Sequence, residues 1–143
     1  MMQKFKLLNH TADIKLEIYG TDVNDLFNSA YLAWFNIVGE IIEIKNKYEE
    51  VEISIIENNL EYLLVEYLRE LNYYLTVKKI FLINPKISIN KNEDFYTINC
   101  KLKGLSLKDC NIIIKEEIKA ITLHNLSIKS INNKQVATIV LDV

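Results

Sequence analysis

The order of two hydrophobic periodicities along the chain is the feature that most constrains the fold. Apolar residues recur at helical spacing over 26–38 and again over 60–75. Alternating apolar and polar residues, typical of strands, fill much of the remaining chain. Because most strands follow the second helix, we expect an α+β fold with a largely antiparallel sheet. Residues 1–143 are expected to form one compact domain. The expected strands are 14–19, 50–55, 81–89, 95–102, 112–124, 126–131 and 136–141, with Asn132-Asn133 as a hairpin turn because Asn tolerates positive φ.

The ends of both helices carry recognisable capping signals. Thr21 or Asp22 can cap the first helix, since a side-chain oxygen there accepts from a free main-chain N–H. Gly39 is expected to close that helix. Asn58, followed three residues later by Glu61, resembles a capping box and predicts the start of the second helix.

The composition excludes several classes of protein. Half of the residues are apolar, and 17 Lys and Arg stand against 19 Asp and Glu, which leaves a net charge of −2. A disordered chain is therefore excluded, and the three Gly and one Pro exclude collagen-like and linker-like chains. Tight direct binding of nucleic acid is not expected, because it normally shows as a basic excess.

Cysteine usage and hydropathy predict a cytoplasmic protein without a membrane partner. Cys100 and Cys110 have the spacing of neither a zinc pair nor a redox dithiol, so we interpret them as small buried apolar residues. The N-terminus develops no apolar signal core. The longest notable uncharged run, 26–39, is far shorter than the ~20 apolar residues that span a bilayer.

Signals for the commonest catalytic sites are missing from the sequence. It has no glycine-rich phosphate loop, nucleophile elbow, paired cysteines or helical histidine pair. His10 and His124 are the only histidines, which excludes a His-rich zinc site. Each can be a general base or a hydrogen-bonded structural residue, and the sequence leaves both interpretations open.

Two aspartates near the chain ends suggest a metal site. Asp13 precedes the first expected strand, and Asp142 ends the last one beside Val143. Their oxygens, with a Val143 carboxylate, are hard ligands that suit Ca²⁺ or Mg²⁺. If both ends meet in one sheet, the two aspartates form one site; otherwise they are solvated turn and tail residues.

Lys119 is a lysine with apolar neighbours on its expected strand face. Strand alternation places it beside Ile121 and Leu123. Such a lysine either guards an edge strand against pairing or is retained for function.

Four segments and the C-terminus together form a recognisable pattern. They are 10–14 (HTADI), 19–22 (YGTD) with 26–27 (LF), 63–68 (LLVEYL) with 70–71 (EL), 117–122 (EIKAIT) with His124, and 141–143 (LDV). With these segments the chain resembles the archease family, the small protein partner of the RtcB-type tRNA-splicing ligase. The resemblance runs from residue 10 to the end of the chain, and the order and spacing of the segments make it specific.

The resemblance implies a fold and a set of site residues. The fold is a β/α/β sandwich in which two helices pack among β-sheets. A divalent cation, Ca²⁺ first with Mg²⁺ or Mn²⁺ as alternatives, is expected on Asp13 and Asp142, with the Val143 carbonyl or carboxylate as a further ligand. The functionally needed lysine of the family corresponds to Lys119, and His124 is a weaker candidate.

The sequence departs from the family pattern on both sides of that histidine. The family usually has Tyr before it and Gly after it, whereas this chain has Leu123 and Asn125.

The resemblance also implies a function, that of a protein cofactor with no catalysis of its own. Such a protein activates the ligase by promoting its guanylylation and its multiple turnover. One alternative is a chaperone-like partner of a tRNA methyltransferase or another RNA-processing enzyme. Another is a small metal-dependent enzyme in which Asp13 and Asp142 hold the ion and His10 or His124 is the base.

Overall fold

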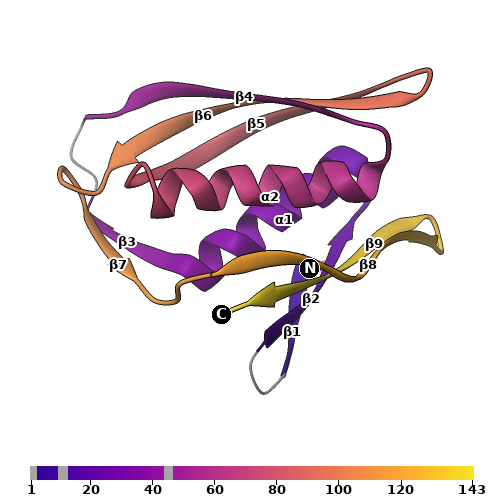
Figure 1. Cartoon of the computed structure of the whole chain (residues 1–143), viewed down its shortest axis with the longest axis horizontal. Coiled ribbons are helices and arrows are strands. Elements are labelled where there is room, and N and C mark those ends of the chain that lie inside the picture. Colours follow the sequence, from indigo (N-terminus) through magenta and orange to yellow (C-terminus); the bar gives the residue numbers. More distant parts are fainter. Residues whose placement is uncertain (1–2, 10–12, 44–46) are drawn as a thin grey trace.

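Two helices lie between two antiparallel sheets in the computed structural model, which describes residues 3–9, 13–43 and 47–143 (Figure 1). Three sheets have the strand orders β1-β2-β9-β8, β4-β6-β5 and β3-β7, and every pairing between described strands is antiparallel. The expected α+β class and β/α/β layering are confirmed. The elements are β1 (Phe5–Asn9), β2 (Asp13–Gly20), α1 (Val23–Val38), β3 (Gly39–Glu43), β4 (Glu49–Glu57), α2 (Leu60–Thr76), β5 (Ile80–Asn92), β6 (Phe95–Ser106), β7 (Asn111–Ile114), β8 (Ala120–Ile131) and β9 (Lys134–Asp142).

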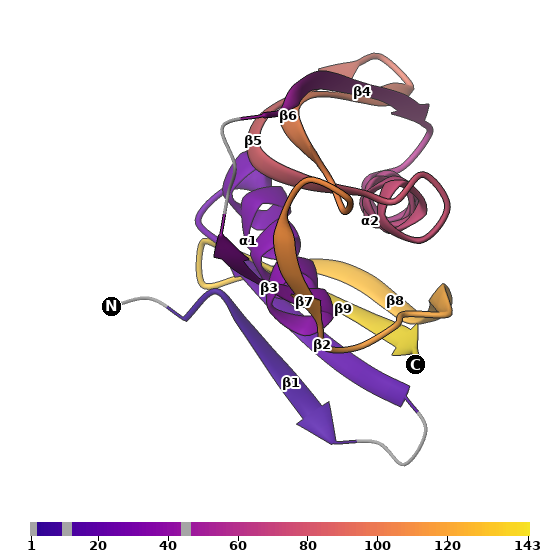
Figure 2. The same cartoon turned by 90° about the vertical axis from the view of Figure 1, so that its left-hand side faces the viewer.

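The core fills the layer that the helices occupy between the sheets. Figure 2 shows α2 nearly end-on, with the β4-β6-β5 sheet above it and β8 below. Trp34 of α1 packs against Phe81 of β5, with ring centroids 5.5 Å apart, and so joins a helix to the upper sheet. Each inner sheet face presents every second residue of its strands to the helices, which is why the strand sequences alternate. Neither described helix is long and apolar enough to cross a membrane.

The two cysteines differ in their surroundings. Cys100 is fully buried, and its Sγ lies 3.9 Å from the Tyr67 hydroxyl. Burial raises the pKa of the Cys100 thiol to about 11, so the thiol stays protonated at neutral pH. Cys110 is only half-buried, so the expectation of burial is confirmed for Cys100 and wrong for Cys110.

The helix caps confirm part of the sequence analysis and correct the rest. Asp22 caps α1, since its carboxylate accepts from the Asp25 N–H at 2.8 Å. The cap of α2 is Asn59, which accepts from the Tyr62 N–H at 2.8 Å, so the choice of Asn58 was wrong by one residue. The reason is that a cap must directly precede the first helical residue to reach the free N–H groups of the first turn.

Gly39 does end α1, but its backbone is extended, with φ −168°. The left-handed conformation typical of glycine at helix ends is therefore not used. A Cβ at this position would lie 2.8 Å from the Phe81 ring, so the glycine provides room for that ring.

The expected strand over 112–124 was wrong as a single element. Its first part is β7, which pairs with β3, whereas β8 starts at Ala120 and pairs with β9. The charged segment 115–119 between them is not a strand, because the chain changes sheets there. The predicted Asn132-Asn133 turn is confirmed, with φ values of 52° and 63°.

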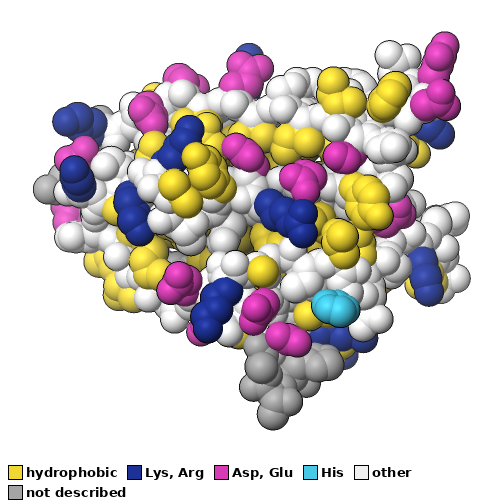
Figure 3. Space-filling view, in the orientation of Figure 1, with side chains coloured by type: hydrophobic (Ala, Val, Ile, Leu, Met, Phe, Trp, Pro, Cys, Tyr) yellow, Lys and Arg dark blue, Asp and Glu magenta, His cyan; other side chains and the backbone are white. Residues whose placement is uncertain are grey.

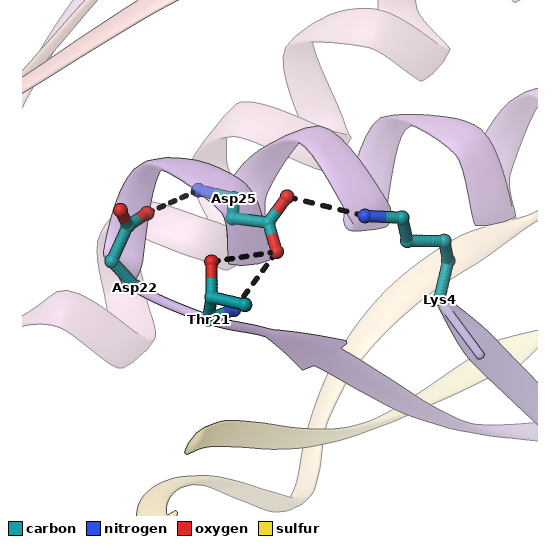
Figure 4. A network of polar contacts seen from close by, with 4 residues as sticks. All are labelled: Lys4, Thr21, Asp22 and Asp25. Carbon is teal, nitrogen blue, oxygen red and sulfur yellow. Dashed lines mark hydrogen bonds and ion pairs between the residues drawn. The ribbon is translucent and has the colours of Figure 1, made fainter. Parts of the chain in front are cut away.

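Asp25 ties the start of α1 to Lys4, the residue before β1. Its carboxylate accepts from the Thr21 N–H at 2.8 Å, the Thr21 hydroxyl at 3.2 Å and the Lys4 ammonium at 3.3 Å (Figure 4). The bond from the Thr21 N–H, helped by Lys4, holds the pKa of Asp25 below its ordinary value of 3.8.

We expect Asp25→Ala to lower the free energy of unfolding by about 1 kcal/mol at pH 7, the usual net contribution of an intramolecular hydrogen bond. A carboxyl with a lowered folded pKa stabilises the fold fully above its unfolded pKa, and loses that contribution as the pH falls through the folded pKa. The difference from wild type should therefore shrink below pH 3.8. Urea unfolding across this range measures it, with Asp94→Ala in the exposed β5–β6 turn as the control. A difference that does not change with pH would contradict the assignment.

Candidate functional site

Asp13 and Asp142 stand directly opposite each other on neighbouring strands. They are paired in the antiparallel register of β2 and β9. Residues paired in this way share one face of the sheet, with Cβ atoms about 4.5–5.5 Å apart. The next pair, Ile14 and Leu141, packs against the core, so the two aspartates lie on the outer face. Both side chains are partly exposed. The structure thus brings together the two acids that the sequence analysis selected.

Lys119 lies beside this aspartate pair. On the other side of β9, Ala120 is the register partner of Asp142. The Lys119 N–H donates to the Asp142 carbonyl at 2.8 Å, and the Lys119 side chain is exposed. The expected strand position of Lys119 was wrong, because residues 115–119 are not a strand and β8 starts at Ala120. Lys119 directly precedes β8, which is an edge strand, so an edge-guarding role and a functional role both remain compatible with this position.

Two side chains of α2 fix the main chain on both sides of Lys119. Arg69 donates from Nε and Nη2 to the Ile121 carbonyl, at 3.1 and 2.9 Å. Asn72 donates from Nδ2 to the Ile118 carbonyl at 2.9 Å. Neither residue was predicted from the sequence as part of the site, although Arg69 is the only arginine of the chain. The only feature of the sequence that could have indicated a role for Arg69 was that it is a single arginine on an amphipathic helix.

A large bulge in β8 moves His124 out of the strand register that contains Asp13 and Asp142. Thr122 pairs with Val140 and Ser127 with Thr138, so residues 123–126 stand opposite the single residue 139. Such bulges redirect side chains, and here both Leu123 and His124 are exposed. His124 is therefore not a neighbour of Asp13 and Asp142 in the strand register, in which Ala120 is the β8 partner of Asp142.

Asn125 explains one departure from the family pattern. Its φ is 53°, which is the left-handed region that glycine adopts freely and asparagine tolerates best among other residues. The bulge therefore needs a residue of this kind after the histidine. Nothing in the structure explains why leucine replaces tyrosine at position 123.

The donor chemistry of the aspartate pair suits a hard divalent cation. Two carboxylates offer up to four oxygens, the ligand type that Ca²⁺ and Mg²⁺ prefer. Within 3–9, 13–43 and 47–143, no group of three or more His, Cys, Asp or Glu lies together, so the pair supplies only part of a coordination shell. The Val143 side chain packs partly buried against the core. His10 lies outside the described residues.

Solved structures share this arrangement of two helices between antiparallel sheets. Protein 1598 of Methanobacterium thermoautotrophicum superposes with a TM-score of 0.83, at 25% identity, covering 99% of this chain and 100% of the other. A Thermotoga maritima structure described as an archease and possible chaperone gives a TM-score of 0.61 at 18% identity, covering 100% and 98%. The fold is therefore that of these small α+β proteins.

Sequence comparison gives the family. The model of the archease protein family matches residues 5–143. Protein archease of Methanosarcina mazei is 30% identical over 99% of this chain and 97% of its own length. The Thermococcus kodakarensis protein of that name is 31% identical, covering 91% of both chains. This chain belongs to the archease family.

Proposed function

We propose that this protein activates an RtcB-type tRNA-splicing ligase by promoting its guanylylation and repeated turnover, and performs no bond chemistry itself. The observation that carries the proposal is that three candidate residues lie close together at one corner of the β1-β2-β9-β8 sheet. Asp13 and Asp142 are register partners there, and Lys119 is hydrogen-bonded to the Asp142 main chain. Family membership supports the same role, which belongs in the cytoplasm with the tRNA-splicing machinery.

The roles of the three residues follow from their chemistry. Asp13 and Asp142 would hold the cation, Ca²⁺ first, and the Val143 carbonyl or carboxylate would add a ligand. A cation held there supplies positive charge that can stabilise phosphate oxygens in the partner's active site. Lys119 offers a compact point charge to a phosphate or to a ligase carboxylate. Arg69 and Asn72 hold the main chain around Lys119, so its position relative to the acids is fixed before the ligase binds.

We expect Lys119→Ala to reduce stimulation of ligase guanylylation about tenfold or more. A charge-assisted contact contributes about 1.5–3 kcal/mol, and about 1.4 kcal/mol corresponds to a factor of ten. The assay follows transfer of labelled GMP to the ligase with wild type, Lys119→Ala and Asp142→Ala.

Lys115→Ala is the matched control, because Lys115 is an exposed lysine in the same segment. It should stimulate the ligase as wild type does. Equal stimulation by all folded variants would overturn the proposal.

A second candidate is a chaperone-like role towards a tRNA methyltransferase or another RNA-processing enzyme. The Thermotoga maritima protein is described as a possible chaperone. In this chain the β3-β7 ribbon exposes Ile42, Ile113 and Ile114, which are 46–58% accessible and could contact an unfolded client. This role predicts that client aggregation is suppressed even by Asp13→Ala and Asp142→Ala, whereas ligase activation is not retained.

A further inference from the structure

Four lysines line a pocket at one end of the β4-β6-β5 sheet. The pocket has a volume of about 460 Å³ and lies where β4 begins, β6 ends and the chain leaves α2. This size falls in the range of about 300–1,000 Å³ that is typical of small-molecule sites. In Figure 3, several Lys or Arg side chains lie at the corresponding left-hand end of the molecule, with Asp and Glu side chains between them. The lysines that line the pocket are Lys47, Lys78, Lys79 and Lys108.

The charge of this pocket is opposite to that of the whole chain. The chain carries −2, whereas the lining has four lysines and two acids, Glu49 and Asp109. One ion pair is found within the lining, between Lys47 Nζ and Asp109 at 4.0 Å, with the lysine side chain 81% exposed. Such an exposed pair contributes little.

The end of α2 accounts for only part of this positive charge. The carbonyl end of a helix carries a partial negative charge, which Lys78 and Lys79 can offset. Lys47 and Lys108 come from other segments of the chain and remain uncompensated by the helix. The pocket therefore favours an anion.

Aromatic rings accompany the lysines. Tyr48 lines the pocket with 51% of its surface exposed, and Lys103 Nζ lies 4.5 Å from its ring centroid. Lys78 Nζ lies 4.4 Å from the centroid of the Tyr74 ring. Proteins that hold single-stranded nucleic acid combine cationic side chains for the backbone with open aromatic rings on which bases stack. An acidic peptide would use the lysines but would have no need of the exposed ring.

The wall of the pocket is held in an uncommon backbone conformation. Lys79 has φ 58°, in the left-handed region that a long side chain rarely occupies. Its carbonyl accepts from the Leu107 N–H at 3.0 Å, which joins the end of α2 to the turn that carries Lys108. Backbone strain of this kind persists where the surrounding structure enforces it, and it concentrates at ligand sites.

We propose that this pocket binds a nucleotide phosphate among its lysines, with the base stacked on Tyr48. The phosphate belongs either to single-stranded RNA or to a free nucleotide, since both present the same group. The site shares no residue with the pair Asp13 and Asp142, and it does not depend on activation of a ligase. Weak, local contact with RNA is compatible with the low overall charge of the chain.

The test measures fluorescence anisotropy of labelled oligouridylate and of labelled GTP with the protein alone. At about 50 mM salt we expect wild type to bind at least one probe with a dissociation constant of about 10–100 μM, in the range of non-specific nucleic-acid binding. At this salt concentration, the double variant Lys47→Ala with Lys108→Ala should bind more than tenfold more weakly, because two phosphate contacts are lost. On RNA, its salt dependence should fall by about 1.4 in log–log slope, for two lost phosphate contacts. Tyr48→Leu should weaken RNA binding about fivefold.

The matched control is Lys86→Ala with Lys101→Ala, which removes two exposed lysines that face each other on β5 and β6. It should change the affinity less than twofold. Binding of RNA alone identifies the strand as the source of the phosphate, and binding of GTP alone identifies the nucleotide.

Three results would overturn the proposal that this pocket binds a nucleotide phosphate. They are no binding of either probe, equal weakening by both lysine pairs, and binding of polyglutamate as tight as that of RNA. Because no ligase is present, failure here is distinguishable from failure of the activator role.

Discussion

Asp142→Asn is expected to weaken Ca²⁺ binding by about tenfold or more, and Asp13→Asn should do the same. Each substitution keeps the side-chain shape but removes one of two charges that stand opposite each other on β2 and β9. Ligand charge largely sets the affinity of an oxygen site for Ca²⁺. Calorimetric titration of the isolated protein measures the loss directly.

The metal-free protein should respond in the opposite direction. Like charges directly opposite on a sheet are destabilising, typically by about 0.2–1 kcal/mol. Without Ca²⁺, each Asn variant should therefore be slightly more stable than wild type. Chelation of the metal should lower the Tm of wild type more than that of the variants, because the variants bind Ca²⁺ more weakly. These opposite signs separate loss of the site from simple misfolding.

Asp94→Asn is the control for this experiment, because it removes the same charge from the exposed β5–β6 turn. It should bind Ca²⁺ as wild type does. Equal Ca²⁺ affinity in all three variants would remove the metal from the proposed function.

The second large effect is expected from Gly20→Ala, which should cost about 3 kcal/mol of stability, at the upper end for inserting atoms into a packed region. Gly20 ends β2 just before α1. A Cβ there would contact the Leu26 main-chain nitrogen and would lie 2.6 Å from the Leu26 Cα. These are backbone atoms of the first helical turn, so no side-chain rotation relieves the clash. Urea unfolding followed by circular dichroism measures the change.

Gly104→Ala is the matched control. Its Cβ would meet the Ile80 and Val51 methyl groups at 2.9 and 3.1 Å and the Glu49 side chain at 3.2 Å. Side-chain atoms can move, so we expect a cost of about 1 kcal/mol or less. Equal costs at both glycines would show that the backbone contact at Gly20 is not the limiting one.

Local chemistry made part of the fold predictable from the sequence. The cap at Asp22 and the Asn132-Asn133 turn depend on the conformational and hydrogen-bonding properties of those residues alone, and both are confirmed. The division of 112–124 was not predictable, because it depends on which distant strands β7 and β8 join. Alternation shows that a segment is a strand, but not where it changes partners.

The candidate site was predictable to a similar extent. The family resemblance indicated Asp13, Asp142 and Lys119, and only the register of β2, β9 and β8 shows that they meet. The contributions of Arg69 and Asn72 could not be predicted, since they bind main-chain carbonyls that look alike in any sequence. A carbonyl acceptor is identified only when the helix is placed against the strand.

The bulge around His124 has a further effect on β8, because it reverses which residues face the core. Four residues of β8 stand opposite one of β9, an excess of three. Since three is odd, odd-numbered Ile121 faces inward before the bulge, whereas even-numbered Ile128 packs on the core after it. The bulge that carries His124 therefore changes which residues of β8 face the core, from odd-numbered before it to even-numbered after it. The number of residues in the bulge can change only by an even number; an odd change would turn the core-facing side chains of one half of β8 to the outer face of the sheet.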